Sequence, residues 1–243
     1  MTTINQGRLG TPRVHLRRTE STNTVARRLA AHGAPHGTLV TAAEQTAGRG
    51  RQGRAWSAPV GAALVCSWVV RDPGPLLSLA AGVAVAELAG ERAWVKWPND
   101  VLIDGRKLAG ILVEGRPQEH WAVLGIGINV ALRPEQLPEE LRERAATLGL
   151  DEADLEPTLV HLSEMLERWL SAPDAEVLHA ARTLDALHGK PVSWEGGSGT
   201  GAGIDDCGRL LVSLPGGASV ALDAGEVHLG SDVYRKRPAG PTA

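Results

Sequence analysis

The first 130 residues contain short segments in which apolar residues alternate with polar ones or run together, separated by turn-forming residues. Such segments are typical of strands that are half or fully buried. A two-residue hairpin turn is also indicated within 101–114, where Asp104-Gly105 stands between two apolar runs. The other predicted strands in this part of the chain are 13–17, 38–43, 61–70, 93–97 and 118–130.

Helices are predicted where apolar residues recur without strand alternation. The first follows Ser21-Thr22-Asn23-Thr24, whose side chains are typical of an N-cap, and it ends near Gly33. The segment 75–90 is rich in Ala and Leu and predicts a mostly buried helix. By contrast, 134–156 is acidic and carries prolines, which predicts a loop with short helices. The predicted helices are 25–31, 75–90, 157–170 and 174–187.

The composition changes after Gly189, where short apolar segments are separated by glycine-rich and Asp-Gly-type turns. This pattern predicts a small β-barrel over 189–234. It follows an α+β unit over 1–188, in which a mixed or antiparallel sheet is flanked by helices. Residues 235–243 are predicted to be a disordered tail. The strands predicted in the barrel are 191–194, 199–204, 210–214, 219–222 and 227–229.

Composition predicts a soluble globular protein, and the cysteines predict a cytoplasmic one. Of its 243 residues, 43% are hydrophobic and 22% are charged, which is ordinary for a soluble domain. No segment approaches the ~20 apolar residues of a membrane helix, and the N-terminus lacks a signal pattern. Cys66 and Cys207 are predicted to be free thiols buried by packing in a reducing compartment. No Cys/His cluster has zinc spacing, so no metal site is predicted.

The segment Gly48-Arg49-Gly50-Arg51-Gln52-Gly53-Arg54-Ala55-Trp56, here called the Gly/Arg loop, carries three arginines and no acid in a chain of formal net charge −3. Glycine allows close backbone approach, and guanidinium groups suit carboxylate and phosphate. The loop is therefore predicted to cover a ligand with more than one negative charge. It matches neither a Walker A loop nor a dinucleotide fingerprint. A plain surface loop and an RNA-binding segment are the alternatives, although the negative net charge and the lack of aromatic residues between the arginines disfavour RNA.

Three more features carry candidate chemistry. Lys96-Trp97-Pro98-Asn99-Asp100-Val101 is either a simple turn or a site facing a nucleotide or metal–phosphate group. Lys107 is either an edge-strand gatekeeper or a cation aimed into a ligand-bearing face, and the adjacent small residues Ala109 and Gly110 favour the second. In Gly125-Ile126-Gly127-Ile128-Asn129, alternate glycines leave one sheet face bare, which admits a ligand or another backbone.

In chain order these segments resemble the biotin protein ligase family, the biotin–[acetyl-CoA-carboxylase] ligases. The resemblance also includes Ser21-Thr22-Asn23, Gln45 and Lys107-Leu108-Ala109-Gly110-Ile111-Leu112-Val113-Glu114. It covers 13–130 through motifs and 189–230 through the predicted barrel. It implies a class II synthetase-like catalytic domain followed by an SH3-like barrel. It also implies that biotin and MgATP give biotinoyl-5′-AMP, which a lysine of a biotin carboxyl carrier domain then attacks to release AMP.

The resemblance implies roles for individual residues. Lys107 and Arg51 would be catalytic. Lys107 would bridge the biotin carboxylate and the α-phosphate, and Arg49 and Arg51 would hold the activated carboxyl and phosphate. The polar end of biotin would be held by Ser21, Thr22, Asn23 and Gln45. Its bicyclic ring would lie against the bare backbone of Gly110, Gly125 and Gly127. The biotin-binding residues implied are Ser21, Thr22, Asn23, Gln45, Gly48, Arg49, Gly50, Arg51, Lys107, Gly110, Gly125 and Gly127. The ATP-binding residues implied are Arg51, Arg54, Trp56, Asn99, Asp100, Lys107 and Asn129.

Alternatives remain at this point. A ligase or transferase acting on lipoate or octanoate is related in fold and differs in the acid it uses. Ser21, Thr22 and Asn23 alone are also compatible with a mere helix cap. Because only twenty residues precede Ser21, a helix-turn-helix domain of about 60 residues has no room there, so no DNA partner is expected. A monomer and a homodimer are both compatible with the sequence, and no membrane partner is expected.

Overall fold

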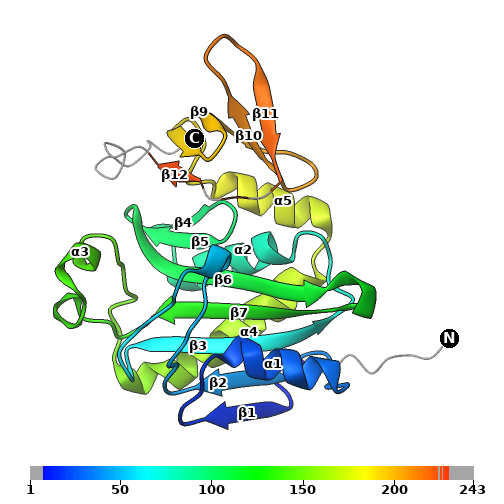
Figure 1. Cartoon of the computed structure of the whole chain (residues 1–243), viewed down its shortest axis with the longest axis vertical. Coiled ribbons are helices and arrows are strands. Elements are labelled where there is room, and N and C mark those ends of the chain that lie inside the picture. The colour runs from blue at the N-terminus through cyan, green and yellow to red at the C-terminus, as the bar shows by residue number, and fades with distance from the viewer. Residues whose placement is uncertain (1–7, 224, 226, 230–243) are drawn as a thin grey trace.

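The computed structural model describes residues 8–223, 225 and 227–229. The predicted tail at 235–243 lies outside these residues, as do 230–234. Seven strands before residue 130 form one mixed sheet in the order β1-β2-β3-β7-β6-β5-β4 (Figure 1). Only β1 and β2 pair in parallel; the other pairs are antiparallel, as expected. The strands are β1 (Arg13–Leu16), β2 (Leu39–Ala42), β3 (Ala63–Arg71), β4 (Ala93–Lys96), β5 (Asp100–Ile103), β6 (Arg106–Arg116) and β7 (Trp121–Asn129).

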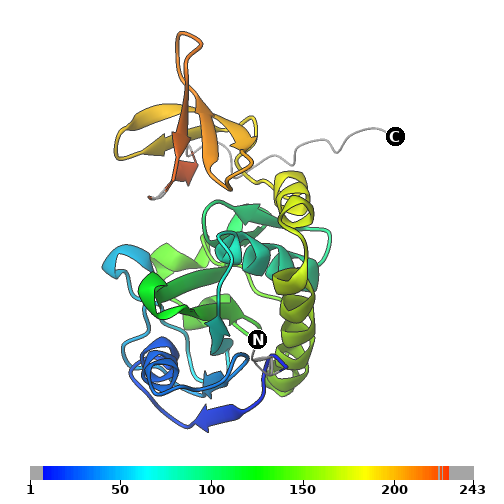
Figure 2. The same ribbon diagram turned by 90° about the vertical axis from the view of Figure 1, so that its right-hand side faces the viewer.

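Helices cover both faces of this sheet (Figure 2). Helix α1 packs on β3 and β7 from one side, while α2 and α4 pack together against the other side. Alternate residues of β3 serve the two faces, because Trp68 joins the core on the α2 side and Val69 joins the smaller core under α1. None of the helices in the described residues is long and apolar enough to cross a membrane. The helices are α1 (Thr22–Ala31), α2 (Leu77–Ala89), α3 (Glu139–Arg142), α4 (Leu155–Ser171) and α5 (Asp174–Thr183).

A second sheet follows α5 and is antiparallel throughout, in the order β11-β10-β9-β8-β12. Its short strands and glycine-rich turns agree with the expected small β unit at the C-terminal end of the chain. Figure 1 places it beyond α5, away from β1 and β2. The strands are β8 (Pro191–Trp194), β9 (Gly197–Ile204), β10 (Leu210–Ser213), β11 (Ser219–Leu222) and β12 (His228–Leu229).

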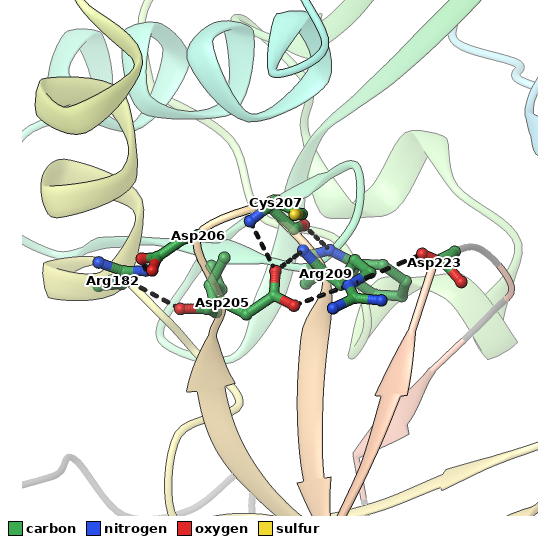
Figure 3. A network of polar contacts seen from close by, with 9 residues as sticks. Arg182, Asp205, Asp206, Cys207, Arg209 and Asp223 are labelled. Atoms are coloured by element: carbon green, nitrogen blue, oxygen red, sulfur yellow. Dashed lines mark hydrogen bonds and ion pairs between the residues drawn. The ribbon is translucent and has the colours of Figure 1, made fainter.

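The turn between β9 and β10 anchors the second sheet to the first. Asp205 shapes this turn by accepting the backbone N–H groups of Cys207 and Arg209, both at 2.9 Å. Arg182 of α5 donates to the neighbouring residue Asp206 at 2.6 Å (Figure 3). From the side of the first sheet, the indole N–H of the buried Trp97 donates to the carbonyl of Gly208 at 3.0 Å. The C-terminal sheet therefore contacts the end of β4, next to the Trp97-Pro98 turn.

The two cysteines behave differently. Cys66 is buried in β3, and this burial raises the pKa of its thiol. Cys207 is exposed in the β9–β10 turn, so the expectation of buried packing was wrong there. The physical reason is that Asp205, Asp206 and Gly208 make this short stretch a turn, and a turn side chain faces solvent regardless of its apolar character.

Candidate functional site

Three glycines lie close together on the α1 face of the sheet. In the register of β6 and β7, Gly110 pairs with Gly127 and Leu112 pairs with Gly125. Paired residues point to the same face, so two neighbouring rows lack side chains at three positions. A cavity of about 130 Å³ opens over them. Its lining includes Ser21, Thr22, Asn23, Gln45, Arg49, Gly50, Arg51, Arg54, Trp56, Asn99, Lys107, Gly110, Gly125 and Gly127.

One end of the cavity is built from buried polar side chains at the start of α1. Ser21, Thr22 and Asn23 are 2–4% exposed. Ser21 is the N-cap residue but makes no side-chain capping hydrogen bond. Instead the side-chain oxygen of Gln45, which follows β2, accepts the Thr22 backbone N–H at 2.8 Å and the Thr22 hydroxyl at 3.1 Å. A side chain distant in sequence thus caps the helix, which argues against a purely local capping role for 21–23.

The orientation of the Asn23 amide is fixed by its neighbours. Its nitrogen donates to a carboxylate oxygen of Glu114 at 2.9 Å and to the carbonyl of Leu112 at 3.3 Å. Its oxygen accepts from the hydroxyl of the fully buried Ser67 at 2.6 Å. Both amide hydrogens are therefore used, and the remaining capacity of Asn23 is a lone pair on Oδ1. That oxygen lies over Gly125, where an added Cβ would stand only 2.0 Å away.

Trp56 covers the other two glycines. An added Cβ at Gly127 would stand 2.4 Å from the Trp56 ring, and one at Gly110 would stand 3.2 Å from it. The Trp56 ring therefore packs on the bare face at the position where the bicyclic ring of the ligand was expected. The indole nitrogen is buried and has no hydrogen-bond partner among the described residues. Its ring centroid lies 5.8 Å from the ammonium of Lys107, within the range of a cation–π contact.

The Gly/Arg loop folds back on itself as a small hairpin. Trp56 donates its backbone N–H to Gly48 at 2.9 Å, and Gly50 donates to Arg54 at 2.7 Å. The backbone of Trp56 approaches Gly48 so closely that a Cβ there would stand 2.3 Å from the Trp56 carbonyl oxygen. A residue with a side chain cannot occupy this position without opening the hairpin. Gly48 is thus needed for loop shape, although its own atoms do not line the cavity.

The arginines of this loop reach different parts of the site. Arg49 pairs with Glu114 on β6 at 3.1 Å, close to Asn23. Arg51 donates to the side-chain oxygen of Asn99 at 3.4 Å, at the other end of the cavity. Asn99 lies beside Gly110, because its backbone carbonyl accepts the Ile111 N–H at 2.8 Å. Gly110 and Glu114 lie four residues apart on β6, which corresponds to about 13 Å along an antiparallel strand. Arg49 and Arg51 therefore reach opposite ends of the cavity, although the family resemblance gave both the task of holding the activated carboxyl and phosphate.

A bulge directs Lys107 into the cavity. The pairing of β5 and β6 shifts between Val101 and Leu102, so that Val101 faces Ala109 and Leu102 faces Lys107. Such a bulge changes which side chains face a given side of a sheet. The Lys107 ammonium forms an ion pair with Asp100 at 2.7 Å while its side chain stays 37% exposed. Lys96 lies 3.7 Å from the same carboxylate, which therefore stands between two cations.

Comparisons with known proteins agree with this arrangement. The Biotin/lipoate A/B protein ligase family matches residues 15–130. A biotin–[acetyl-CoA-carboxylase] ligase of Mycobacterium tuberculosis is 37% identical over 234 residues, which is 87% of this chain and 86% of the relative. This chain belongs to the biotin protein ligase family. The solved biotin protein ligase of Aquifex aeolicus in complex with biotin and ATP superposes with a TM-score of 0.74 at 28% identity, covering 90% of this chain and 99% of that one.

A longer relative matches only in part. The bifunctional ligase/repressor of Bacillus subtilis is 44% identical over 141 residues, which is 53% of this chain. The chain spans 43% of the length of that relative in the match. The shared segment is thus a fraction of the bifunctional protein, whereas the Mycobacterium ligase is matched over most of its length.

Two residues expected in the ATP site of this family member do not line the cavity. Asp100 is absent from the lining, and its largely buried carboxylate pairs with Lys107. Asn129 is buried and its amide donates to the carbonyls of Ala146 at 2.9 Å and Lys107 at 3.4 Å, so it supports the backbone that carries Lys107. No cluster of His, Cys, Asp or Glu that could hold a metal ion occurs in the part of the chain that the structure describes.

Two side chains of the site escaped sequence reasoning. Ser67 lies within an apolar strand, and no local sequence signal indicates that its hydroxyl belongs to the polar end of the cavity. The register explains its role, because Ser67 pairs with Gly125 and so stands directly below Asn23. Glu114 is part of a family-like motif, yet its contacts to Asn23 and Arg49 depend on the fold. A prediction of sheet register would have found both.

Proposed function

We propose that this chain is an ATP-dependent biotin protein ligase, which adenylates biotin and transfers it to a lysine of a biotin carboxyl carrier domain. The observation that carries the proposal is the buried polar end of the cavity. Asn23 presents only an acceptor there, because both its amide hydrogens are used within the protein. Gln45 uses its oxygen for Thr22 and so presents its amide nitrogen as a donor.

This arrangement suits a cyclic urea. The fused ring of biotin carries two N–H donors and one carbonyl acceptor, and these complement Asn23 and Gln45 respectively. The acids of the lipoate and octanoate class end in sulfur or methyl groups, which make no strong hydrogen bonds. Such an acid would leave the remaining lone pair of Asn23 and the amide nitrogen of Gln45 without partners from the ligand. Each unsatisfied buried group costs about 1–3 kcal/mol, which favours biotin strongly.

The opposite end suits activation of a carboxylate. The proposed first step joins a biotin carboxylate oxygen to the α-phosphorus of ATP and breaks the bond to pyrophosphate. Lys107 and Arg51 would offset the repulsion between the two anions, and removal of one such group typically costs 10²–10³-fold in rate. For Lys107 to bind substrate oxygens, its ammonium would be shared with Asp100. Mg²⁺ would enter as part of MgATP and shield the departing pyrophosphate.

The proposed second step is acyl transfer. The amine of a carrier lysine attacks the biotinoyl carbonyl, AMP leaves, and the amine loses a proton. The carrier of an acetyl-CoA carboxylase is the proposed partner, consistent with the printed name of the Mycobacterium relative. The free thiols of Cys66 and Cys207 fit the reducing cytoplasm, which is the proposed location.

An ATP–pyrophosphate exchange assay with biotin, lipoate and octanoate tests the proposal. We expect exchange with biotin alone, followed by a mass increase of one biotinoyl group on a carrier domain. Lys107→Ala should lower biotin-dependent exchange by at least ~10²-fold. Lys190→Ala removes a lysine outside the cavity and should leave exchange unchanged. Exchange supported by lipoate or octanoate but not by biotin would overturn the substrate assignment.

A further inference from the structure

Glu114 connects three elements that are far apart in the sequence: β6, α1 and the Gly/Arg loop. It lies on β6 opposite Val123 of β7, on the same face as the cavity glycines. Its side chain is 16% exposed and binds Asn23 of α1 through Oε2 at 2.9 Å. Through Oε1 it pairs with Arg49 of the Gly/Arg loop at 3.1 Å and with Arg27 of α1 at 3.4 Å. One carboxylate thus touches both the floor of the cavity and the loop that covers it.

We propose that Glu114 is a positioning residue that couples occupation of the polar end of the cavity to closure of the Gly/Arg loop. The coupling rests on the proposed function, because biotin is the ligand that would occupy this end. A ligand that donates to Asn23 Oδ1 polarises the amide, which strengthens the hydrogen bond from Asn23 to Glu114. A carboxylate held in this position retains Arg49, and Arg49 holds the loop over the ligand.

The burial of Glu114 distinguishes this contact from an ordinary surface pair. Arg18 and Glu44 form such a pair at 3.3 Å, with side chains 68% and 38% exposed, and a pair of that kind contributes little. A carboxylate at 16% exposure has lost much of its hydration and needs its partners more. Removing its charge therefore affects Asn23 and Arg49 together, rather than one surface contact.

Arg27 gives the Glu114 carboxylate a second cationic partner, which remains when Arg49 moves away. Arg49 is 48% exposed and belongs to the loop, whereas Arg27 belongs to a helix packed on the sheet. When the loop opens, Glu114 keeps a cationic partner in Arg27 and is not left as an isolated buried charge. The open and closed loop thus differ by one ion pair and not by an unpaired carboxylate, which keeps both states accessible.

Coupling of this kind is reciprocal. If biotin favours the closed loop through Glu114, the closed loop must favour biotin by the same factor. Coupling free energies between sites typically correspond to factors of 5–150. The expected signature is therefore a biotin-dependent protection of the loop against trypsin, which cleaves after its arginines. If Glu114 merely stabilises the fold, its substitution leaves this protection unchanged in the folded, biotin-saturated protein.

The test compares Glu114→Gln with Glu44→Gln, the same substitution at the exposed pair with Arg18. Calorimetry first gives the biotin concentration that saturates each variant. The rate of tryptic cleavage within the Gly/Arg loop is then measured without biotin and at that saturating concentration. In the wild type and in Glu44→Gln, biotin should slow cleavage strongly. In Glu114→Gln, the protection at saturation should be smaller by at least ~5-fold, and the affinity for biotin should fall by the same factor.

Arg49→Gln examines the same contact from the exposed side and should fold even if Glu114→Gln does not. Measured as cleavage after the remaining loop arginines, Arg51 and Arg54, its protection by biotin should fall to the same extent, and the double variant should lose no more than either single variant. Wild-type protection in biotin-saturated Glu114→Gln or Arg49→Gln would overturn the coupling. Failure of the wild type to bind biotin at all would instead overturn the proposed function, so the two failures are distinguishable.

Discussion

Replacing Gly125 by alanine should damage the polar end of the cavity more than the rest of the fold. The new Cβ would stand 2.0 Å from Asn23 Oδ1 and 2.7 Å from its Cγ, distances that non-bonded atoms do not tolerate. Asn23 cannot rotate away freely, because Ser67 and Glu114 hold its two ends at 2.6 Å and 2.9 Å. Either the amide leaves these partners or β7 moves relative to β3.

The contacts at risk give the expected magnitude. A neutral hydrogen bond contributes about 0.5–1.5 kcal/mol and one to a charged group about 1.5–3 kcal/mol. Loss of the Ser67 and Glu114 contacts together therefore predicts destabilisation of about 2–4 kcal/mol. In a protein of this size each kcal/mol lowers Tm by about 2–4 °C, so Tm should fall by roughly 4–16 °C. Biotin affinity should fall by at least ~100-fold, because the ligand loses a positioned acceptor.

Calorimetry with biotin and thermal unfolding measure the two effects. Gly74→Ala is the matched control, because an added methyl group there meets nothing within 4 Å. The variant Asn23→Ala/Gly125→Ala removes the clash, so it should unfold close to the temperature of Asn23→Ala alone while still binding biotin poorly. A Gly125→Ala protein with unchanged Tm and unchanged affinity would refute the geometry. A double variant no more stable than Gly125→Ala would place the strain elsewhere.

Three further outcomes are expected. Lys107→Ala should keep biotin affinity within a few-fold while adenylate formation, measured by quenched-flow, falls at least ~10²-fold. Trp97→Phe removes the indole donor to Gly208, so denaturant unfolding should show a loss of about 1–3 kcal/mol with biotin affinity unchanged; a weaker affinity would contradict this separation. Burial raises the pKa of Asp185, so ionisation of this carboxyl opposes folding. The protonated carboxyl contributes to stability at low pH, and this contribution is lost as the pH rises through the raised pKa of the folded state. Asp185→Asn should therefore stabilise the protein at pH 7 and progressively less toward pH 4, as followed by urea unfolding.

Local signals in the sequence were sufficient for the order and type of the elements. Asp104 and Gly105 both adopt positive φ, 50° and 77°, which is the geometry that the Asp-Gly hairpin signal requires. The alternate glycines at 125 and 127 do leave a bare face, as predicted. These features depend on neighbours within a few residues, so no tertiary information was needed to find them.

Features that depend on partners distant in the sequence could not be predicted from local signals. Helix α1 begins at Thr22, three residues before the predicted start, because Gln45 satisfies the Thr22 N–H from another element. Trp56 was expected on the ATP side, and nothing local indicates that its ring packs on Gly127. Asn129 resembles a ligand contact in sequence, yet it serves the backbone of Lys107. In each case the deciding neighbour is at least 20 residues away.

The sheet register explains why motifs spread over a hundred residues act as one site. β3, β7 and β6 are neighbours, so Ser67, Gly125 and Leu112 form one row and Val65, Gly127 and Gly110 form the next. A slip of β6 by one residue would present Ile111 to the cavity and turn Glu114 to the opposite face. The buried Ile111 packs in the core with α2, so such a slip would expose apolar surface and bury a charge at once. The same burial that stabilises the core therefore also fixes the positions of the glycines and of Glu114, which means that fold stability and site geometry are set by one register.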